Sequence, residues 1–574
     1  MTSIRAAIGH QLAPTATASP RAMLVPLALA QFIASYDSGS MNVAITDIAT
    51  DLDTTITGVQ TAISLFTLVM AAGMITGSRL TDIWGRRTCF QIGIVLYGLG
   101  ALTTALSPAF WVMVMGWSVF EGVGSALMIP PIYILISVSF DDVKARAKAF
   151  GLVSGMAGIA AAVGPLLGGA FATYITWRAS FASEVLVTML ILYLSLRIAE
   201  PARTGKKPSL DILGAVLSAA GMILIVLGVL QSKTYGWTTS RKDFDIGDVT
   251  ILKEGQISPV WLMIGIGLAI LLLFALWQVW RERRGRDPLI PMHLFKNRVS
   301  NLGLITQNAQ WFMMIGLSFI VAVFLQVAQG YNAIETGLIL TPSTVGLLIV
   351  SAFAGRLARK WSPRALIASG FVLAEIGLGL LFLLVSPSSG PLSFTPGLFV
   401  FGAGAGIMIT ASVNVVQSAV PEEDQGGISG VSRSVSNLGS SLGTAIAGSV
   451  LVAGIIIRAT SLTQDSDVLT QDEKNQVFNY LDGDVSALSD NQVESALAGW
   501  PQASIDEAVS INDDARNRAL GLAIVVVGIV GLVGLTASLW LPGKRPAPVA
   551  SEPGPTRAGP SSGDAHRIAA RRAG

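Results

Sequence analysis

Charge is scarce in this sequence. Only 13% of its 574 residues are Asp, Glu, Lys or Arg, while 52% are hydrophobic, and an ordinary soluble domain carries roughly 25% charged residues. A chain with so little charge cannot hide its apolar residues inside one water-soluble globule, so we expect a lipid bilayer to surround them. The net charge of +2 is too small to indicate a nucleic-acid partner.

Residues that carry catalysis or bind metals are also few. The one cysteine, Cys89, excludes an intrachain disulfide and argues against a thiolate metal cluster, and none of the three histidines lies in an apolar run. Any proton relay within the membrane therefore has to use carboxylates. We find no Walker-type phosphate loop, catalytic triad or metal-ligand cluster. The sequence thus predicts no enzyme, no cofactor and no metal, and ATP is not the expected energy source.

Fourteen apolar runs are long enough to cross a bilayer, which takes about 20 residues. They fall near residues 23–45, 58–77, 89–107, 111–135, 149–171, 179–198, 210–231, 260–280, 300–326, 336–354, 365–385, 394–418, 435–457 and 518–541. Clusters of Lys and Arg follow the second, fourth, sixth, eighth and tenth runs. Because basic loops stay in the cytoplasm, both termini are predicted to be cytoplasmic.

Three motifs occupy fixed places in this order. The chain reads Ser78-Arg79-Leu80-Thr81-Asp82-Ile83-Trp84-Gly85-Arg86-Arg87 after span 2, and Gly164-Pro165-Leu166-Leu167-Gly168-Gly169 at the end of span 5. Span 1 contains Asp37 and then Asn42-Val43-Ala44. Together these motifs resemble the major facilitator superfamily, and in particular its fourteen-span drug:proton antiporter branch. Trp177-Arg178 follows in the next external loop, and this dipeptide resembles one often found there in drug exporters.

The resemblance implies an all-α integral membrane fold of two six-helix bundles with two inserted helices. The expected divisions are a cytoplasmic segment 1–22, an N-terminal bundle 23–198, the inserted helices 210–280, a C-terminal bundle 300–541 with an acidic external loop 459–516, and a disordered cytoplasmic tail 542–574. Capping boxes that begin at Thr470, Ser489 and Ser504 predict short helices in the external loop. Alternating access around a midplane site is expected.

Two motifs have roles that the resemblance suggests. Asp82, Gly85, Arg86 and Arg87 would latch the cytoplasmic face through charge-assisted hydrogen bonds to helix ends, although a simple positive-inside anchor is the alternative. Gly164, Pro165, Gly168 and Gly169 would let span 5 bend and let a neighbouring helix approach closely. Plain helix packing is the alternative for this second motif.

Carboxylates inside the spans are the candidate proton sites. Span 4 carries Ser118 where the branch usually has Arg, and Glu121 where it has Gln, so the usual coupling arginine is missing. An ionised group at mid-bilayer costs at least about 2.5–3.5 kcal/mol, which favours a function for Asp37, Glu121 and Glu184. The alternative is that each acid makes a satisfied hydrogen bond between helices. Glu375, on a helix expected at the periphery, is interpreted as structural.

Polar side chains on three spans are candidates for lining a central cavity. They are Asn42, Gln307, Asn308, Gln310, Asn414 and Gln417. The expected function is proton-driven export of amphipathic, cationic small molecules by a monomer in a bacterial cytoplasmic membrane. One alternative is an exporter or facilitator of an endogenous lipid or secondary metabolite with altered proton coupling. A non-transporting membrane scaffold is the other.

Overall fold

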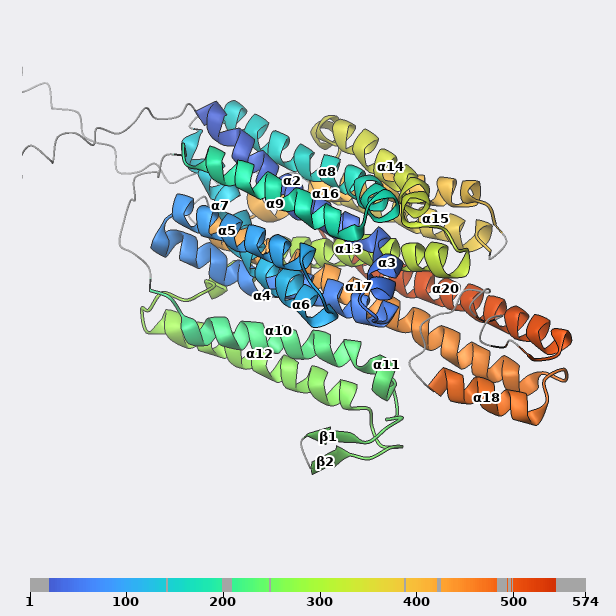
Figure 1. Cartoon of the computed structure of the whole chain (residues 1–574). Coiled ribbons are helices and arrows are strands. Elements are labelled where there is room, and N and C mark those ends of the chain that lie inside the picture. The colour runs from blue at the N-terminus through green and yellow to red at the C-terminus, as the bar shows by residue number, and fades with distance from the viewer. Residues whose placement is uncertain are drawn as a thin grey trace, which may run out of the picture.

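The protein is a bundle of long helices. A computed structural model describes residues 20–140, 143–198, 209–246, 249–386, 389–420, 425–482, 493, 497 and 499–543, and Figure 1 shows their arrangement. Thirteen helical stretches in this described part are long and apolar enough to cross a membrane. Helix α2 (Pro20–Val43) supplies the fourteenth predicted span, so the expected all-α membrane fold is confirmed.

The first six spans form one bundle and the last six form another. The first bundle consists of α2, α4 (Ile56–Trp84), α5 (Arg86–Ala105), the continuous helix α6–η1–α7 (Phe110–Val114, Met115–Glu121, Gly122–Ser139), α8 (Val143–Tyr174) and α9 (Trp177–Ser195). Short α3 (Ile45–Asp51) follows α2. The second bundle consists of α13 (Arg298–Val323) with η3 (Phe324–Ala328), α14 (Ala333–Lys360), α15 (Pro363–Leu384), α16 (Phe394–Ser418), α17 (Gln425–Asp465) and α20 (Gln502–Leu539).

The two bundles meet along two helix pairs. Helix α4 packs against α17, and α8 packs against α14. We call the contact of α4 with α17 the first seam and the contact of α8 with α14 the second seam. Within the N-terminal bundle α2 lies against α8, and within the C-terminal bundle α13 lies against α17. These are the first and fifth spans of each bundle, so the two bundles present equivalent helices to their interface.

The two inserted spans form an antiparallel hairpin, α10 (Ile212–Leu230) and α12 (Pro259–Arg283). Their connection contains α11 (Ser232–Tyr235) and a two-stranded antiparallel ribbon, β1 (Phe244–Ile246) and β2 (Val249–Leu252), in which Asp245 pairs with Thr250. The ribbon was not predicted. The ribbon β1–β2 marks one end of the molecule. We call this end, where the ribbon connects the two helices of the inserted hairpin, the hairpin face. The opposite end, where α2 begins and α4 gives way to α5, is the basic face (Figure 1).

The predicted external loop is wrong in one respect, because half of its described residues continue the neighbouring helices. Helix α17 runs on to Asp465 and α20 begins at Gln502, while α18 (Gln471–Asp482) lies beside them. The Thr470 capping box is confirmed, since the Glu473 N–H donates to Thr470 Oγ1 at 3.4 Å and the Thr470 N–H to Glu473 Oε2 at 2.8 Å.

The other two capping boxes differ from the prediction. The Ser504 box is wrong, because Pro501 precedes the first helical residue of α20 and Ser504 already lies inside the helix. A proline fits this helix start because the first N–H groups have no partner in the helix. The Ser489 box lies outside the described residues, as do the segment 1–19 and the tail from 544 onward.

Candidate proton and substrate site

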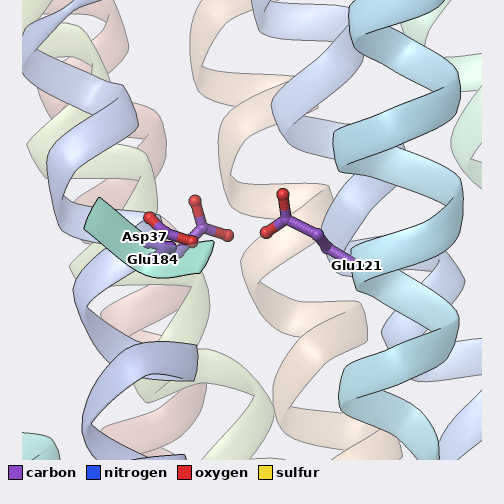
Figure 2. Close-up of side chains that lie close together, drawn as sticks. All are labelled: Asp37, Glu121 and Glu184. Atoms are coloured by element: carbon purple, nitrogen blue, oxygen red, sulfur yellow. The ribbon is translucent and has the colours of Figure 1, made fainter. Parts of the chain in front are cut away.

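Three carboxylates from three helices of the N-terminal bundle converge on one point. Asp37 lies on α2, Glu121 ends η1 and Glu184 lies on α9. One carboxylate oxygen of each residue lies within 4.8 Å of the corresponding oxygens of the other two, as Figure 2 shows. The three residues are 0–1% exposed. We call this group the acid cluster.

A local irregularity in span 4 brings two residues to the acid cluster. Residues Met115–Glu121 form a π-helix, a wide turn that shifts the residues after it around the helix axis. Within this turn Trp117 donates to Asp37, and Glu121 reaches the cluster. Ser118, in the position of the branch's usual arginine, donates instead to the backbone oxygen of Ala62 at 2.9 Å.

The space for Glu121 depends on a glycine of the neighbouring helix. A Cβ atom added at Gly100 of α5 would lie 2.5 Å from Glu121 Cγ. Such a contact is closer than carbon atoms approach in proteins, so any larger residue would displace the carboxylate. The glycine at this position therefore sets the place of the third acid.

The hydrogen bonds of the acid cluster are incomplete. Trp117 Nε1 donates to both oxygens of Asp37, at 2.9 and 2.8 Å, and the Tyr97 hydroxyl donates to Glu184 Oε2 at 3.1 Å. In the described part of the chain, neither oxygen of Glu121 has a hydrogen-bond partner, and Glu184 Oε1 has none. The salt bridges of the described residues also do not reach the cluster.

Charge repulsion dictates what this arrangement can do. Three ionised carboxylates this close together, away from water and without a cation, would repel one another strongly. The acid cluster therefore has to hold protons or a cation. Hard divalent cations take six or more oxygen ligands, whereas the next neighbours here include the aromatic residues Trp117 and Tyr97. Protons are the better fit.

Aromatic side chains enclose the acid cluster. Trp117 stacks on Phe66 with ring centroids 5.1 Å apart, and it makes a T-shaped contact with Phe181 at a centroid distance of 6.4 Å. These residues, like the hydrogen-bond partners of the acids, all belong to the N-terminal bundle. The named contacts of the acid cluster are thus made within one bundle.

The polar candidates on spans 9 and 12 mostly hold the C-terminal bundle together. Ser432 of α17 donates to Gln307 at 2.7 Å, Asn308 donates to the Val435 oxygen at 2.9 Å, Ser412 of α16 donates to Gln310 at 3.0 Å, and Gln417 donates to Ser429 at 2.8 Å. Asn414 is exposed on α16. Asn42, near the end of α2, donates to the Ser38 oxygen at 3.0 Å.

The motif after span 2 is largely helical, which corrects the predicted loop. Helix α4 continues through Trp84 and includes Asp82, and only Gly85, with φ at 110°, breaks the chain before α5. Such a φ suits glycine alone. At the start of α5, next to Arg86, Arg87 donates to the Leu196 oxygen at the end of α9, at 3.0 Å. This contact joins two helices of the same bundle.

The glycine-rich motif of span 5 contacts two helices. Gly164 lies against α2, where an added Cβ would be 2.9 Å from the Tyr36 oxygen, and Gly168 lies against Ser40 of the same helix. Gly169 faces α14, and its added Cβ would be 2.6 Å from the Ala333 oxygen. Pro165 lies inside α8. The motif therefore lets α8 approach both α2 and the other bundle.

Contacts across the two bundles involve residues that the sequence did not single out. The Arg433 guanidinium of α17 lies 4.7 Å from the ring centroid of Tyr133 on α7 and donates to its hydroxyl. At the other end, Gln326 of η3 donates to the Val43 oxygen at 3.0 Å and accepts from the Thr46 N–H at 3.3 Å. The bundles are thus joined near both faces. Arg433 was missed because it precedes the predicted start of span 13.

The external Trp-Arg motif has a clear local role. Asp51 at the end of α3 accepts from Trp177 Nε1 at 3.0 Å and from Arg178, which also donates to the Ser107 oxygen at 2.8 Å. Desolvation of the partly buried carboxyl opposes ionisation, but the hydrogen bonds from Arg178 and Trp177 outweigh it and hold the pKa of Asp51 below its usual value. This cluster fastens the hairpin-face ends of three elements.

Two six-helix bundles that meet along paired helices, with ionisable groups buried among the spans, define a secondary membrane transporter. A family model described as Major Facilitator Superfamily matches residues 27–444, and the chain belongs to that superfamily. It is therefore a multi-pass membrane transporter and not an enzyme. The predicted resemblance is confirmed.

Individual relatives have names that refer to drug resistance. The chain is 28% identical to the multidrug resistance protein Stp of Mycobacterium tuberculosis over 75% of each chain. It is also 28% identical to the tetracenomycin C resistance and export protein of Streptomyces glaucescens, over 78% of this chain and 79% of the relative. Among solved structures, a D-xylose-proton symporter shares the fold with a TM-score of 0.54 at 13% identity, over 92% of this chain and 99% of that one.

Proposed function

We propose that this transporter exports amphipathic, cationic small molecules in exchange for protons by alternating access. The acid cluster carries the proposal. Buried charges in a membrane protein are costly and are usually retained for a function. Here Glu121 is fully buried and both of its oxygens lack a hydrogen-bond partner in the described structure. A carboxyl group in that setting favours the protonated form, and the loss of its proton changes the charge of the whole N-terminal bundle.

The geometry suggests how a substrate and protons exclude one another. A cationic substrate between the bundles stabilises ionised carboxylates, because charges attract strongly in a medium of low dielectric constant. Binding of the substrate then favours proton release from the acid cluster, and reprotonation favours substrate release. The hydrogen bonds from Trp117 to Asp37 connect the cluster to the π-helical turn, so a change of charge acts on the helix that also carries Tyr133.

The distribution of charge and the names of relatives support the proposed direction and location. Basic residues gather at one end of the bundle, which predicts that the basic face and both termini lie in the cytoplasm of a bacterial cell. One relative is named a resistance and export protein, which supports export. Each bundle supplies one side of a single central interface within the chain, so we expect a functional monomer.

Proteoliposomes with an imposed pH gradient test the proposal. Lipophilic cations added to the wild-type protein should collapse the gradient, and Asp37→Asn or Glu121→Gln should abolish that collapse. Glu375→Gln is the matched control, because Glu375 is a carboxyl of span 11 outside the acid cluster. Proton movement that persists in both cluster variants, or that fails equally in the control, would contradict the assigned proton site.

A second candidate is the export or facilitated movement of an endogenous lipid or secondary metabolite, with altered proton coupling. The name of the tetracenomycin C relative favours it, and so does the absence of the branch's usual arginine at Ser118. The same liposomes distinguish the two. Saturable movement of a neutral lipid or metabolite without proton flux would favour the second candidate. Movement of cations alone, with proton flux, would favour the first.

A further inference from the structure

The two seams between the bundles differ in their hydrogen bonding. At the first seam, Gln60 of α4 donates to the Thr444 oxygen of α17 at 2.8 Å, Ser441 donates to the Ser64 oxygen at 2.8 Å, and Ser434 donates to the Ala71 oxygen at 2.6 Å. These bonds fall within residues 60–71 of α4 and 434–444 of α17, about three turns of each helix. They tie the two bundles together along this stretch of the first seam.

The inserted hairpin covers the first seam from outside. A continuous apolar cluster joins residues of all three helices there: Leu68, Ala71 and Ala72 of α4, Met222, Val226, Val229 and Leu230 of α10, and Ala445 of α17. Leu68 and Ala445 have no exposed surface. Helix α12 packs on the other side of α10. A molecule in the bilayer would have to displace two helices to reach this seam.

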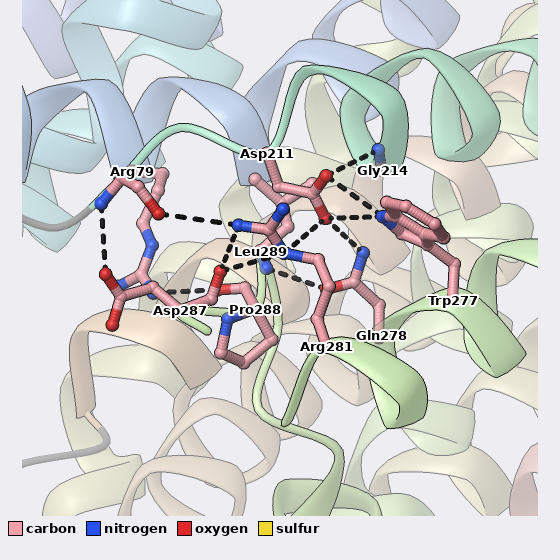
Figure 3. Close-up of polar contacts among 10 residues, drawn as sticks. Arg79, Asp211, Gly214, Trp277, Gln278, Arg281, Asp287, Pro288 and Leu289 are labelled. Atoms are coloured by element: carbon pink, nitrogen blue, oxygen red, sulfur yellow. Dashed lines mark hydrogen bonds and ion pairs between the residues drawn. The ribbon is translucent and has the colours of Figure 1, made fainter. Parts of the chain in front are cut away.

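A buried polar network holds the hairpin in this position, as Figure 3 shows. Asp211, just before α10, accepts from Trp277 Nε1 at 3.0 Å and Gln278 Nε2 at 2.8 Å, and pairs with Arg281 at 3.5 Å. Gln278 in turn accepts from the Leu289 N–H at 2.7 Å. These contacts therefore fix the two inserted helices and the segment that follows α12 to one another.

The same network is fastened to the N-terminal bundle. Arg281 donates to the Asp287 oxygen at 2.8 Å, and Arg79 of α4 donates to the adjacent Pro288 oxygen at 2.7 Å (Figure 3). Asp211 is 1% exposed. Removing one partner of a buried, hydrogen-bonded ion pair is strongly destabilising, so the hairpin is held firmly over the first seam.

The second seam has a different construction. Its helices touch through small groups: a Cβ added at Gly337 would lie 2.5 Å from the Pro165 oxygen, and one added at Gly158 would lie 3.3 Å from Leu348 Cδ2. One hydrogen bond, from the Ile334 N–H to Thr173 Oγ1 at 3.2 Å, closes the hairpin-face end. Among the described residues of this seam, glycines make close contacts of this kind in place of a series of hydrogen bonds like the one at the first seam.

The outer side of the second seam is apolar and exposed. Leu167 beside the Pro165 contact is 43% exposed, and Leu338 beside Gly337 is 57% exposed. Figure 1 places α8 and α14 on the side of the bundle opposite α10 and α12. Helix α2, which carries Asp37, lies directly behind, since Pro165 Cδ would be 3.1 Å from a Cβ at Gly39. Separation of α8 from α14 at this place would therefore connect the bilayer with the helix that carries Asp37.

We infer that the second seam is the lateral portal through which amphipathic molecules pass between the bilayer and the space between the bundles, and that the inserted hairpin closes the first seam to them. This inference rests on the proposed function, because only a substrate that partitions into the membrane needs such a route. A water-soluble cation can reach the same space from the aqueous side. The two kinds of substrate should therefore respond differently to a block at the second seam.

Photolabelling tests the portal without any need for proton coupling. A lipophilic cation with a photoreactive group is irradiated with the wild-type protein in liposomes, and the labelled peptides are identified by mass spectrometry. Labelling that concentrates on α8 and α14 supports the portal. Labelling concentrated on α4, α17 or the inserted hairpin overturns it. Because binding alone gives the label, this result stands even if no proton-driven transport is found, an outcome that would contradict only the proposed function.

Obstructing variants supply the functional test. Leu167→Trp and Leu338→Trp place bulk at the edge of the second seam. Val216→Trp on α10 and Leu268→Trp on α12 are matched controls, because these positions are 57% and 56% exposed on the inserted hairpin. We expect the seam variants to slow the extraction of a cationic dye that fluoresces only in the bilayer by about fivefold or more, because opening of the seam gates its passage.

The same variants should leave the transport of a water-soluble cation within about twofold of wild type, which also shows that they are folded. Control variants that slow the bilayer dye as much as the seam variants would overturn the inference. Equal slowing of both substrates by the seam variants would overturn it as well, because a portal affects only the substrate that arrives from the bilayer.

Discussion

Replacing Arg433 tests the balance between conformations of this transporter most directly. The guanidinium stacks on Tyr133 of the other bundle and donates to its hydroxyl, and Tyr133 in turn donates to Gln31 at 3.1 Å. The cation–π contact contributes about 0.5–2 kcal/mol, and a hydrogen bond from a charged donor about 1.5–3 kcal/mol. Arg433→Gln should therefore destabilise the conformation closed at the basic face by about 2 kcal/mol or more.

That loss has a measurable consequence for the populations. A free-energy difference of about 1.4 kcal/mol corresponds to a factor of about ten in population. The population of the conformation closed at the basic face should therefore fall about 30-fold relative to the one open at that face. Spin labels on cysteines at Trp84 and Trp361 report the separation of the bundles in a Cys89→Ser background. These positions end α4 and follow α14, and they are 48% and 46% exposed. The longer distance should dominate in Arg433→Gln.

Two controls make the measurement decisive. Arg433→Lys retains the positive charge over the Tyr133 ring and should shift the spin-label distances less than Arg433→Gln does. Tyr133→Phe keeps the ring but removes the hydroxyl, and it should give an intermediate population. Distance distributions that are the same in wild type, Arg433→Gln and Tyr133→Phe would refute the reasoning, because the contact would then contribute nothing to closure.

Three further changes have definite expected outcomes. Gly85→Ala forces alanine into a backbone conformation that costs about 1–3 kcal/mol, so it should lower the thermal unfolding temperature. Gly379→Ala, where an added Cβ meets open space, should leave that temperature unchanged. Because its partners lower the pKa of Asp51 in the folded protein, Asp51→Asn should reduce stability at neutral pH. That difference should shrink as the pH falls below the unfolded value of about 3.9 and through the lower folded pKa. A difference that stays constant as the pH falls below the unfolded value would contradict the assignment. Asp211→Asn should increase hydrogen exchange in α10 and α12. Asp287→Asn, at a carboxylate that accepts the Ser209 N–H, should increase it less, and equal protection in both variants would refute the anchoring role of Asp211.

The sequence was sufficient for the number and order of spans, because the length of an apolar run is set by bilayer thickness and does not depend on tertiary packing. Helix ends were harder to predict. Helix α4 continues through Arg79 and Asp82 to Trp84, and α17 extends well beyond both limits of its predicted span 435–457. Polar residues outside the apolar core keep a helix going without any signal in hydropathy. The expected loops at these places therefore turned out to be helix.

The candidate site could be predicted only as separate residues. Asp37, Glu121 and Glu184 stand out in the sequence because acids are rare in spans, but their convergence depends on how three helices pack. The π-helical turn Met115–Glu121 is decisive, and no residue pattern predicts it. Trp117 went unnoticed for a related reason, since aromatic residues are common in membrane helices and nothing local indicates that its N–H meets a carboxylate.

The length of α17 gives the C-terminal bundle a rigid arm. Its 41 residues correspond to about 60 Å of helix at about 1.5 Å per residue, twice the roughly 30 Å thickness of the hydrocarbon core. Arg458 of α17 pairs with Asp514 of α20 at 2.9 Å, and Arg518 pairs with the same carboxylate at 3.3 Å, so the two projecting helices move as one piece. A small tilt of the bundle within the membrane is thereby amplified into a larger sweep at the tip. An antibody fragment or fluorophore fixed near Asp465 would indicate, from outside the bilayer, which way the transporter is facing.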